Sequence, residues 1–312
     1  MKFPEYIRIS FLLVLIFSPV CSGYAGGIKT PDENALISCF FKDLYNFSFH
    51  EADSIVSVMN ESEMDNVTLS NIKANLAWWK LLSGDDIGTN LKTCDSCIHE
   101  SIRLGLKNKT KDLKSLLNII YSYSLKARLE NYRGNTLKSV IYFYKSVNYI
   151  SECIDIPLKD EKLNLMLGLY FYFIDYIENK YFLMNAMLFS FPRGDKNKGL
   201  MYLEECSSSG NEMTKTESNY FLMKIYAHTE NDYLKAFLKV QILTQQYPNN
   251  LVYSLERLRL LLKMKREDEA RIFQKKLIVE ILVAKNLNSS QKSHFIFQIG
   301  ELISPGKSVT SL

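Results

Sequence analysis

The sequence has few prolines, and the patterns typical of β-strands are nearly missing from it. Between Pro31 and Pro305 the only prolines are Pro157, Pro192 and Pro248. Each of these three falls between segments with apolar residues at helical spacing. Helix interiors exclude proline because it removes a hydrogen bond and clashes with the preceding turn. Sustained alternation of apolar and polar residues is rare, and the hairpin dipeptides Asn-Gly and Asp-Gly do not occur. These absences argue against a β-rich fold and favour a chain of consecutive helices.

The chain also lacks the usual signatures of nucleic-acid binding, cofactor binding and catalysis. Its net charge is +4 and it has no long basic run, so nucleic acid is not an expected partner. Its 13 glycines are scattered rather than gathered in a phosphate-binding loop, and its four histidines form no HExxH pair. We therefore expect no cofactor and no enzymatic activity.

Cysteine is scarce, and one close pair stands out. Cys94 and Cys97 lie in the segment Cys94–His99, which offers three metal ligands at most, whereas a structural zinc site needs about four. A thioredoxin-like pair is expected after a strand, with a lowered thiol pKa, and no strand is predicted here. The favoured interpretation is structural thiols or a local disulfide between Cys94 and Cys97. A redox role and a metal site are the alternatives.

The first 25 residues have the layout of a secretory signal peptide. Lys2 and Arg8 give a basic start, residues 9–17 form an apolar core, and the small residues Gly23 and Ala25 suit a cleavage site. The apolar run is shorter than the roughly 20 residues that span a bilayer. We expect cleavage after Ala25, which would leave 287 of the 312 residues in a periplasmic or secreted protein.

Cys21 supports an alternative for the N-terminus. A lipid-modified cysteine at this position would attach the protein to a membrane, as in an outer-membrane lipoprotein that aids nutrient uptake. The preceding residues, Ser18-Pro19-Val20, lack the leucine and the small residue that are usual before such a cysteine. Membrane association is thus expected only through lipidation at Cys21.

Capping residues and apolar periodicity predict an all-α domain over residues 26–303, followed by a flexible tail at 304–312. Ser48 with Glu51 and Thr214 with Glu217 have the spacing of capping boxes. The predicted helices span residues 31–46, 49–60, 68–83, 91–107, 111–131, 135–153, 158–179, 181–190, 195–208, 214–229, 232–246, 250–263, 266–285 and 289–302.

The clearest internal unit is the helical hairpin from Thr214 to Asn250, which has about the 34-residue length of a tetratricopeptide repeat. It resembles that family in an aromatic residue near its start, small and large apolar residues at the helix contact, and a closing proline. The residues that carry the resemblance are Tyr220, Met223, Ala236, Val240, Leu243 and Pro248. The next unit repeats part of the pattern at Ala270 and Leu277, so two tandem repeats cover residues 214–285. Lys224 departs from the family pattern.

Two further segments carry weaker similarities. Residues 44–53, followed by Trp78-Trp79, are similar to the opening of exported bacterial repeat proteins of unassigned role. Gly194 and Gly199, with the leucines that follow, are similar to the eukaryotic inclusion-body-clearance repeat family. Adjacent helical residues point about 100° apart, so we expect one of the two tryptophans to be buried and the other to face solvent.

The resemblance implies a right-handed superhelix of antiparallel helical hairpins, with about 14 helices in all. Such proteins hold a protein or peptide in a concave groove, so we expect a non-catalytic scaffold or adaptor. The inner face of the clearest repeat nominates Asn219, Tyr220, Lys224 and Tyr226 as binding residues.

Residues 163–191 contain two apolar runs that carry almost no charge. One interpretation is a central helix pair that is buried on all sides. The other is a groove lined by Tyr170, Tyr172 and Tyr176, since tyrosine offers a large contact area with one polar tip.

Overall fold

The computed structural model describes residues 33–108, 112–156, 160–180, 188–189 and 191–303. The predicted signal peptide, the lipidation site at Cys21, most of the helix predicted at 181–190 and the tail at 304–312 lie outside the described residues.

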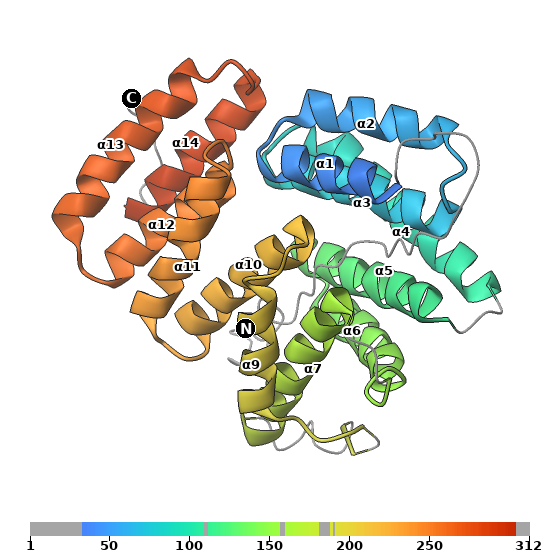
Figure 1. The fold of residues 1–312 in the computed structure, drawn as a ribbon. Helices are drawn as coiled ribbons and strands as arrows, with labels where there is room; N and C mark the ends of the chain where they lie inside the picture. The colour runs from blue at the N-terminus through green and yellow to red at the C-terminus, as the bar shows by residue number, and fades with distance from the viewer. Residues whose placement is uncertain (1–32, 109–111, 157–159, 181–187, 190, 304–312) are drawn as a thin grey trace.

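The described chain is all-α, with thirteen helices and no strand (Figure 1). Each lies within four residues of the range predicted for it. The helices are α1 (Glu33–Tyr45), α2 (Phe49–Glu61), α3 (Asn66–Leu82), α4 (Ile87–Lys107), α5 (Leu113–Tyr132), α6 (Thr136–Ser151), α7 (Glu161–Lys180), α9 (Lys196–Cys206), α10 (Glu212–His228), α11 (Tyr233–Gln246), α12 (Leu251–Lys263), α13 (Glu267–Val283) and α14 (Ser289–Ile303). None of these described helices has both the length and the apolar character that a membrane crossing would require.

Consecutive helices pack as antiparallel hairpins, and the hairpins stack in order along the chain (Figure 1). The pairs are α1 with α2, α3 with α4, α5 with α6, α7 with α9, α10 with α11, and α12 with α13, and α14 closes the stack. The first helix of a pair is the more buried one. In α5 every residue from Leu116 to Glu130 is buried, whereas α6 buries only one face. The predicted fold of stacked helical hairpins is confirmed.

Asp and Asn side chains begin most of the helices by accepting backbone N–H groups that would otherwise lack partners. These caps are Asp65, Asp86, Asp112, Asp160, Asp195, Asn211, Asp232, Asn250 and Asn288. At the two predicted capping boxes the structure differs from the prediction. Ser48 precedes α2 but its side chain makes no capping bond. Thr214 lies inside α10, where Asn211 accepts its N–H at 3.0 Å.

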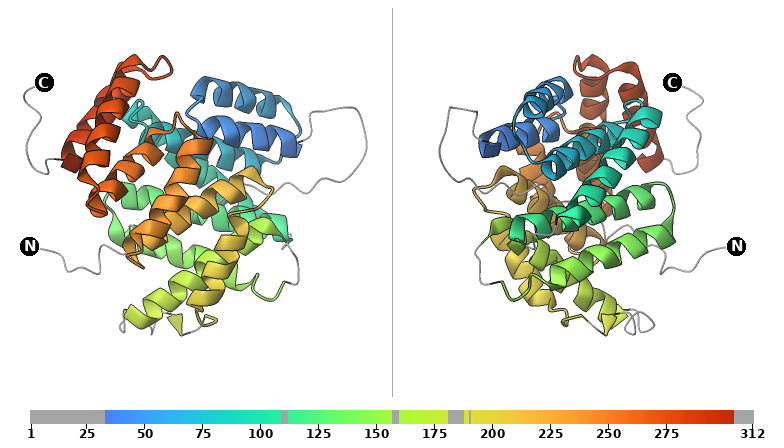
Figure 2. Two further views of the ribbon diagram at one scale, coloured as in Figure 1. Left: turned by 60° about the vertical axis from the view of Figure 1, so that its left-hand side comes forward. Right: turned by 90° about the vertical axis from the view of Figure 1, so that its right-hand side faces the viewer.

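The stack also closes on itself, because the C-terminal hairpins touch the N-terminal ones. Asn250, before α12, donates to the backbone oxygen of Tyr45 at 2.8 Å, and Gln291 of α14 donates to Ser83 at 2.8 Å. In both views of Figure 2 the first hairpin, in blue, and the last helices, in red, lie at the same end of the molecule. The inner helices therefore pack against distant hairpins as well as their neighbours.

Candidate functional site

The four candidate binding residues on α10 differ in their exposure, and therefore in whether a partner could contact them. Asn219 and Tyr226 are buried. The Asn219 amide donates to backbone oxygens of Ser207 and Lys215, and the Tyr226 hydroxyl donates to Glu204 at 2.9 Å. Both side chains therefore hold neighbouring helices in place.

Tyr220 and Lys224 remain partly accessible on the same helix. Lys224 keeps 24% of its side chain exposed and forms an ion pair with Glu256 of α12 at 2.6 Å. Burial alone would raise the pKa of Glu256, but the cations of Lys224 and Arg259 lower it to about 2. Lys224 thus already has a charge partner within the protein.

The three nominated tyrosines of α7 likewise contact other parts of the chain. The Tyr170 hydroxyl donates to the backbone oxygen of Pro192 at 2.7 Å, and the Tyr172 hydroxyl donates to Glu230 at 2.5 Å. Both rings are buried. Tyr176 is half-buried, with the Lys180 ammonium 5.0 Å from its ring centroid. The arrangement fits the central-helix interpretation of this segment.

Both tryptophans are buried, which corrects the expectation that one would face solvent. Trp78 packs edge-on against Tyr132 and beneath Arg128, whereas Trp79 packs against Tyr45 and Tyr253. Helix α3 has neighbours on two sides because the stack closes, so adjacent positions both find a packed environment.

Glu217 and Arg128 form the core of a buried polar cluster that the sequence did not reveal. Glu217 of α10 accepts a hydrogen bond from Tyr45 of α1 at 2.6 Å. Its second carboxylate oxygen has no partner, and neither does one terminal nitrogen of Arg128 nor the hydroxyl of Tyr121, both on α5. Burial raises the pKa of Glu217 to about 7, although Arg128 and Tyr45 act in the opposite direction. Burial of unpaired charged and polar groups lowers the stability of the folded protein unless the charges are neutralised.

The Cys94–His99 segment lies in α4 and does not form a reactive centre. Cys94 is buried and Cys97 is partly buried, and both are free thiols. Burial raises the pKa of each thiol, so little of the nucleophilic thiolate is present at neutral pH. Among the described residues no group of three or more His, Cys, Asp or Glu side chains is placed to hold a metal ion.

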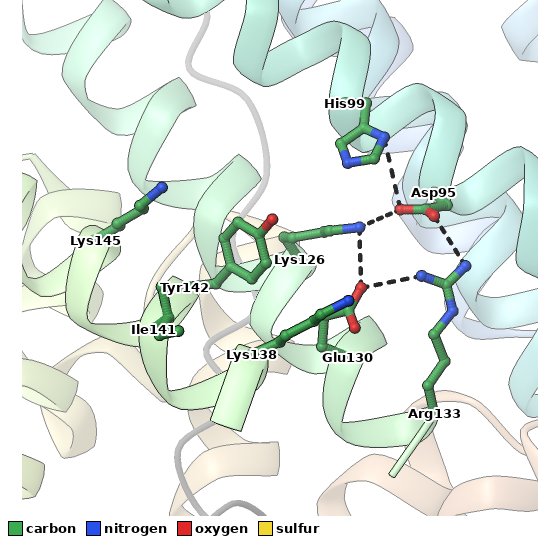
Figure 3. A pocket seen from close by; sticks show the side chains of 9 residues that line it. All are labelled: Asp95, His99, Lys126, Glu130, Arg133, Lys138, Ile141, Tyr142 and Lys145. Atoms are coloured by element: carbon green, nitrogen blue, oxygen red, sulfur yellow. Dashed lines mark hydrogen bonds and ion pairs between the residues drawn. The ribbon is translucent and has the colours of Figure 1, made fainter. Parts of the chain in front are cut away.

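A pocket of about 320 Å³ lies beside this segment, between α4, α5 and α6 (Figure 3). Its lining is mostly charged, with one aromatic ring and one aliphatic side chain. The lining residues are Asp95, His99, Lys126, Glu130, Arg133, Lys138, Ile141, Tyr142 and Lys145.

Ion pairs fix one side of the pocket. Asp95 binds the Lys126 ammonium and lies 2.9 Å from the Arg133 guanidinium, and Glu130 lies 3.1 Å from Lys126 and 3.0 Å from Arg133. Burial alone would raise the pKa of both carboxyl groups, but these cations lower it below its usual value. Both carboxylates are therefore ionised at neutral pH, and they balance the two cations.

The pocket also carries two cations, Lys138 and Lys145, that form no ion pair with these carboxylates. Lys138, Tyr142 and Lys145 extend from α6, and both lysines are exposed (Figure 3). Neither lysine has an ion-pair partner among the described residues. The Lys145 ammonium lies 5.5 Å from the ring centroid of Tyr142 and 5.6 Å from that of Tyr123. Sequence reasoning missed this site, although its signal is visible as charged and aromatic residues spaced i, i+4 and i+7 on one helix face.

Comparison with known proteins adds no assignment, since no protein-family model, curated protein or solved structure matches the chain.

Proposed function

We propose that the protein is an exported, non-catalytic scaffold that binds a protein or peptide partner. The observation that carries this proposal is the pocket between α4, α5 and α6, which combines surplus charge, an aromatic ring and a fixed polar wall. Exposed cations and aromatic rings on a rigid helical scaffold are suited to recognition. The thiols of the same region have raised pKa values, which disfavours thiol chemistry as its role.

Selection from a phage-displayed library of random twelve-residue peptides tests the binding role. The purified chain should enrich peptides that bind saturably by calorimetry, and mass spectrometry should recover each bound peptide unchanged. A library that yields no saturable binder, or a peptide that is cleaved or modified by the protein, would contradict the proposal.

Export is tested separately by the intact mass of the protein recovered from a secreting host. A chain that begins at Gly26 is the expected result, because the residues before it have the layout of a cleaved signal peptide. A mass that corresponds to a chain beginning at a lipid-modified Cys21 would instead support the lipoprotein. An unprocessed chain would contradict both cleavage after Ala25 and lipidation at Cys21, and would support an uncleaved N-terminal anchor.

A further inference from the structure

We propose that the pocket between α4, α5 and α6 binds an acidic segment of a peptide in an extended conformation, with Lys138 and Lys145 as its charge partners. This inference rests on the proposed function and names the class of ligand. It places the contact beside the outer helices α4 and α6, away from the inner faces of α7 and α10 that the sequence nominated.

The charge balance of the pocket determines the sign of the ligand. Lys126 and Arg133 are neutralised by Asp95 and Glu130, so they act as a fixed wall rather than as free cations. Lys138 and Lys145 are left with a surplus of two positive charges. An anionic ligand therefore gains attraction at the α6 side without breaking an existing ion pair, whereas a cationic ligand would meet like charges.

The pocket, with a volume of about 320 Å³, has room for one or two side chains of a bound segment. An extended or polyproline-type chain presents one side chain at a time and can place it in a space of this size.

The spacing of the lysines indicates where the acidic residues belong. Lys138 and Lys145 are seven residues apart on α6, which separates their backbones by about 10 Å along the helix axis. In a polyproline-type segment, residues i and i+3 lie on one face about 9 Å apart. Two carboxylates with this spacing can each meet one lysine.

A single phosphate fits this arrangement less well than two carboxylates. One phosphate cannot contact two lysines whose backbones are about 10 Å apart unless both side chains fold toward each other. The residue best suited to bidentate phosphate recognition is arginine, and Arg133 is already engaged by Asp95 and Glu130.

The apolar groups of α6 give the segment a second kind of contact. Ile141 and Leu137 expose 54% and 82% of their surface on the same outer side of the helix. Tyr142 lies between the two lysines in sequence, and its ring, which lies beside the Lys126 and Lys145 ammonium groups, adds apolar area to the pocket wall. The apolar area of these three side chains suits a peptide rather than a small inorganic anion.

Fluorescence anisotropy with labelled nine-residue peptides tests the proposal. The probe is three repeats of Glu-Ser-Ser, which places carboxylates three residues apart, and its neutral match is three repeats of Gln-Ser-Ser. The full chain is compared with the double variant Lys138→Glu/Lys145→Glu. A control variant, Lys275→Glu/Lys285→Glu, makes the same change in net charge at exposed lysines in and after α13.

We expect the acidic probe to bind at least tenfold more tightly than the neutral one. The double variant on α6 should lose at least tenfold in affinity, while the control variant should change less than twofold. The variant Lys138→Arg/Lys145→Arg should retain binding, because it keeps both charges.

Three results would overturn the inference. These are equal binding of the acidic and neutral probes, equal losses in the α6 and control variants, and binding of a phosphoserine peptide where the glutamate probe does not bind. Library peptides that bind without acidic residues and are insensitive to the α6 variant would overturn the inference and leave the proposed function standing. A chain that binds no peptide of any kind would overturn both.

Discussion

Glu217 occupies a position where the sequence predicts an exposed helix-capping residue, but its carboxyl group is buried in the structure. Burial of this group lowers the stability of the folded protein when it is ionised. The sequence predicts a capping box of Thr214 with Glu217, but α10 begins at Glu212 and Asn211 provides the cap. Glu217 is then carried one turn further into the helix, where it faces Tyr45 of α1 and the Arg128 guanidinium of α5. Its raised pKa follows from this burial, because water no longer stabilises the charged form.

Glu217 should therefore make the protein less stable as pH rises toward neutrality. Its pKa is about 7 in the folded protein against 4.5 for an ordinary glutamate, so the folded state holds the proton longer. The stabilisation that comes from keeping Glu217 protonated is fully present below pH 4.5 and is lost as the pH rises through 7. The free energy of unfolding should fall by on the order of 3 kcal/mol over this range. Urea unfolding measured from pH 4.5 to 8 checks this slope.

The variant Glu217→Gln isolates this contribution, because glutamine resembles the protonated acid. It should match the natural protein near pH 4.5 and exceed it in unfolding free energy above pH 7. The hydrogen bond from Tyr45 can be kept, since the amide oxygen accepts it. Parallel pH profiles for the two proteins would show that Glu217 does not titrate in this range.

At the scale of helices, the hairpin of α7 and α9 depends on two facing glycines. A Cβ atom built on Gly199 would lie 2.5 Å from the backbone nitrogen of Tyr172 and 2.7 Å from the backbone oxygen of Gly168. A Cβ on Gly168 would lie 3.2 Å from the backbone oxygen of Gly199. The backbones of the two helices are therefore in direct contact. The backbone atoms that a new Cβ would meet cannot move aside unless a whole helix shifts.

We expect Gly199→Ala to destabilise the protein by about 2 kcal/mol. Overpacking costs about 1–3 kcal/mol and outweighs the gain of up to about 1 kcal/mol from replacing glycine in a helix. Gly88→Ala is the matched control, because Gly88 is helical in α4 and a Cβ there would meet only Asp86 Oδ1 at 3.9 Å. Chemical denaturation should separate the two variants, and equal stabilities would show that the backbone approach is looser than the structure has it.

Helices could be predicted from the sequence far better than the contacts between distant hairpins. Proline placement and apolar periodicity are local signals, so the described helices lie within four residues of their predicted ranges. The burial of Trp79 against Tyr253 depends on which hairpins meet across the stack, and the repeat pattern carries no such information. The pocket on α6 was missed for a different reason, since Asp95 and Glu130 neutralise its other cations only in the folded chain.

At the scale of the whole molecule, closure distinguishes this stack from an open solenoid. In an open array each repeat touches only its neighbours, so damage to one end stays local. Here Phe295 of α14 packs against Phe47, before α2, with ring centroids 6.2 Å apart. The first and last of the described helices are thereby joined, and the described stack should unfold as one unit rather than from either end.

Phe295→Ala tests this coupling, because it removes a fully buried ring from the junction. The substitution should cost about 3–5 kcal/mol and raise amide hydrogen exchange in α1 and α2 as well as in α13 and α14. Leu277→Ala is the control, since Leu277 is equally buried on α13 but that helix packs only on α12 and α14 among the principal helix contacts. Its cavity should loosen the C-terminal helices first. If both variants leave exchange in α1 and α2 unchanged, the hairpins behave as an open array and the contact between the ends contributes little to stability.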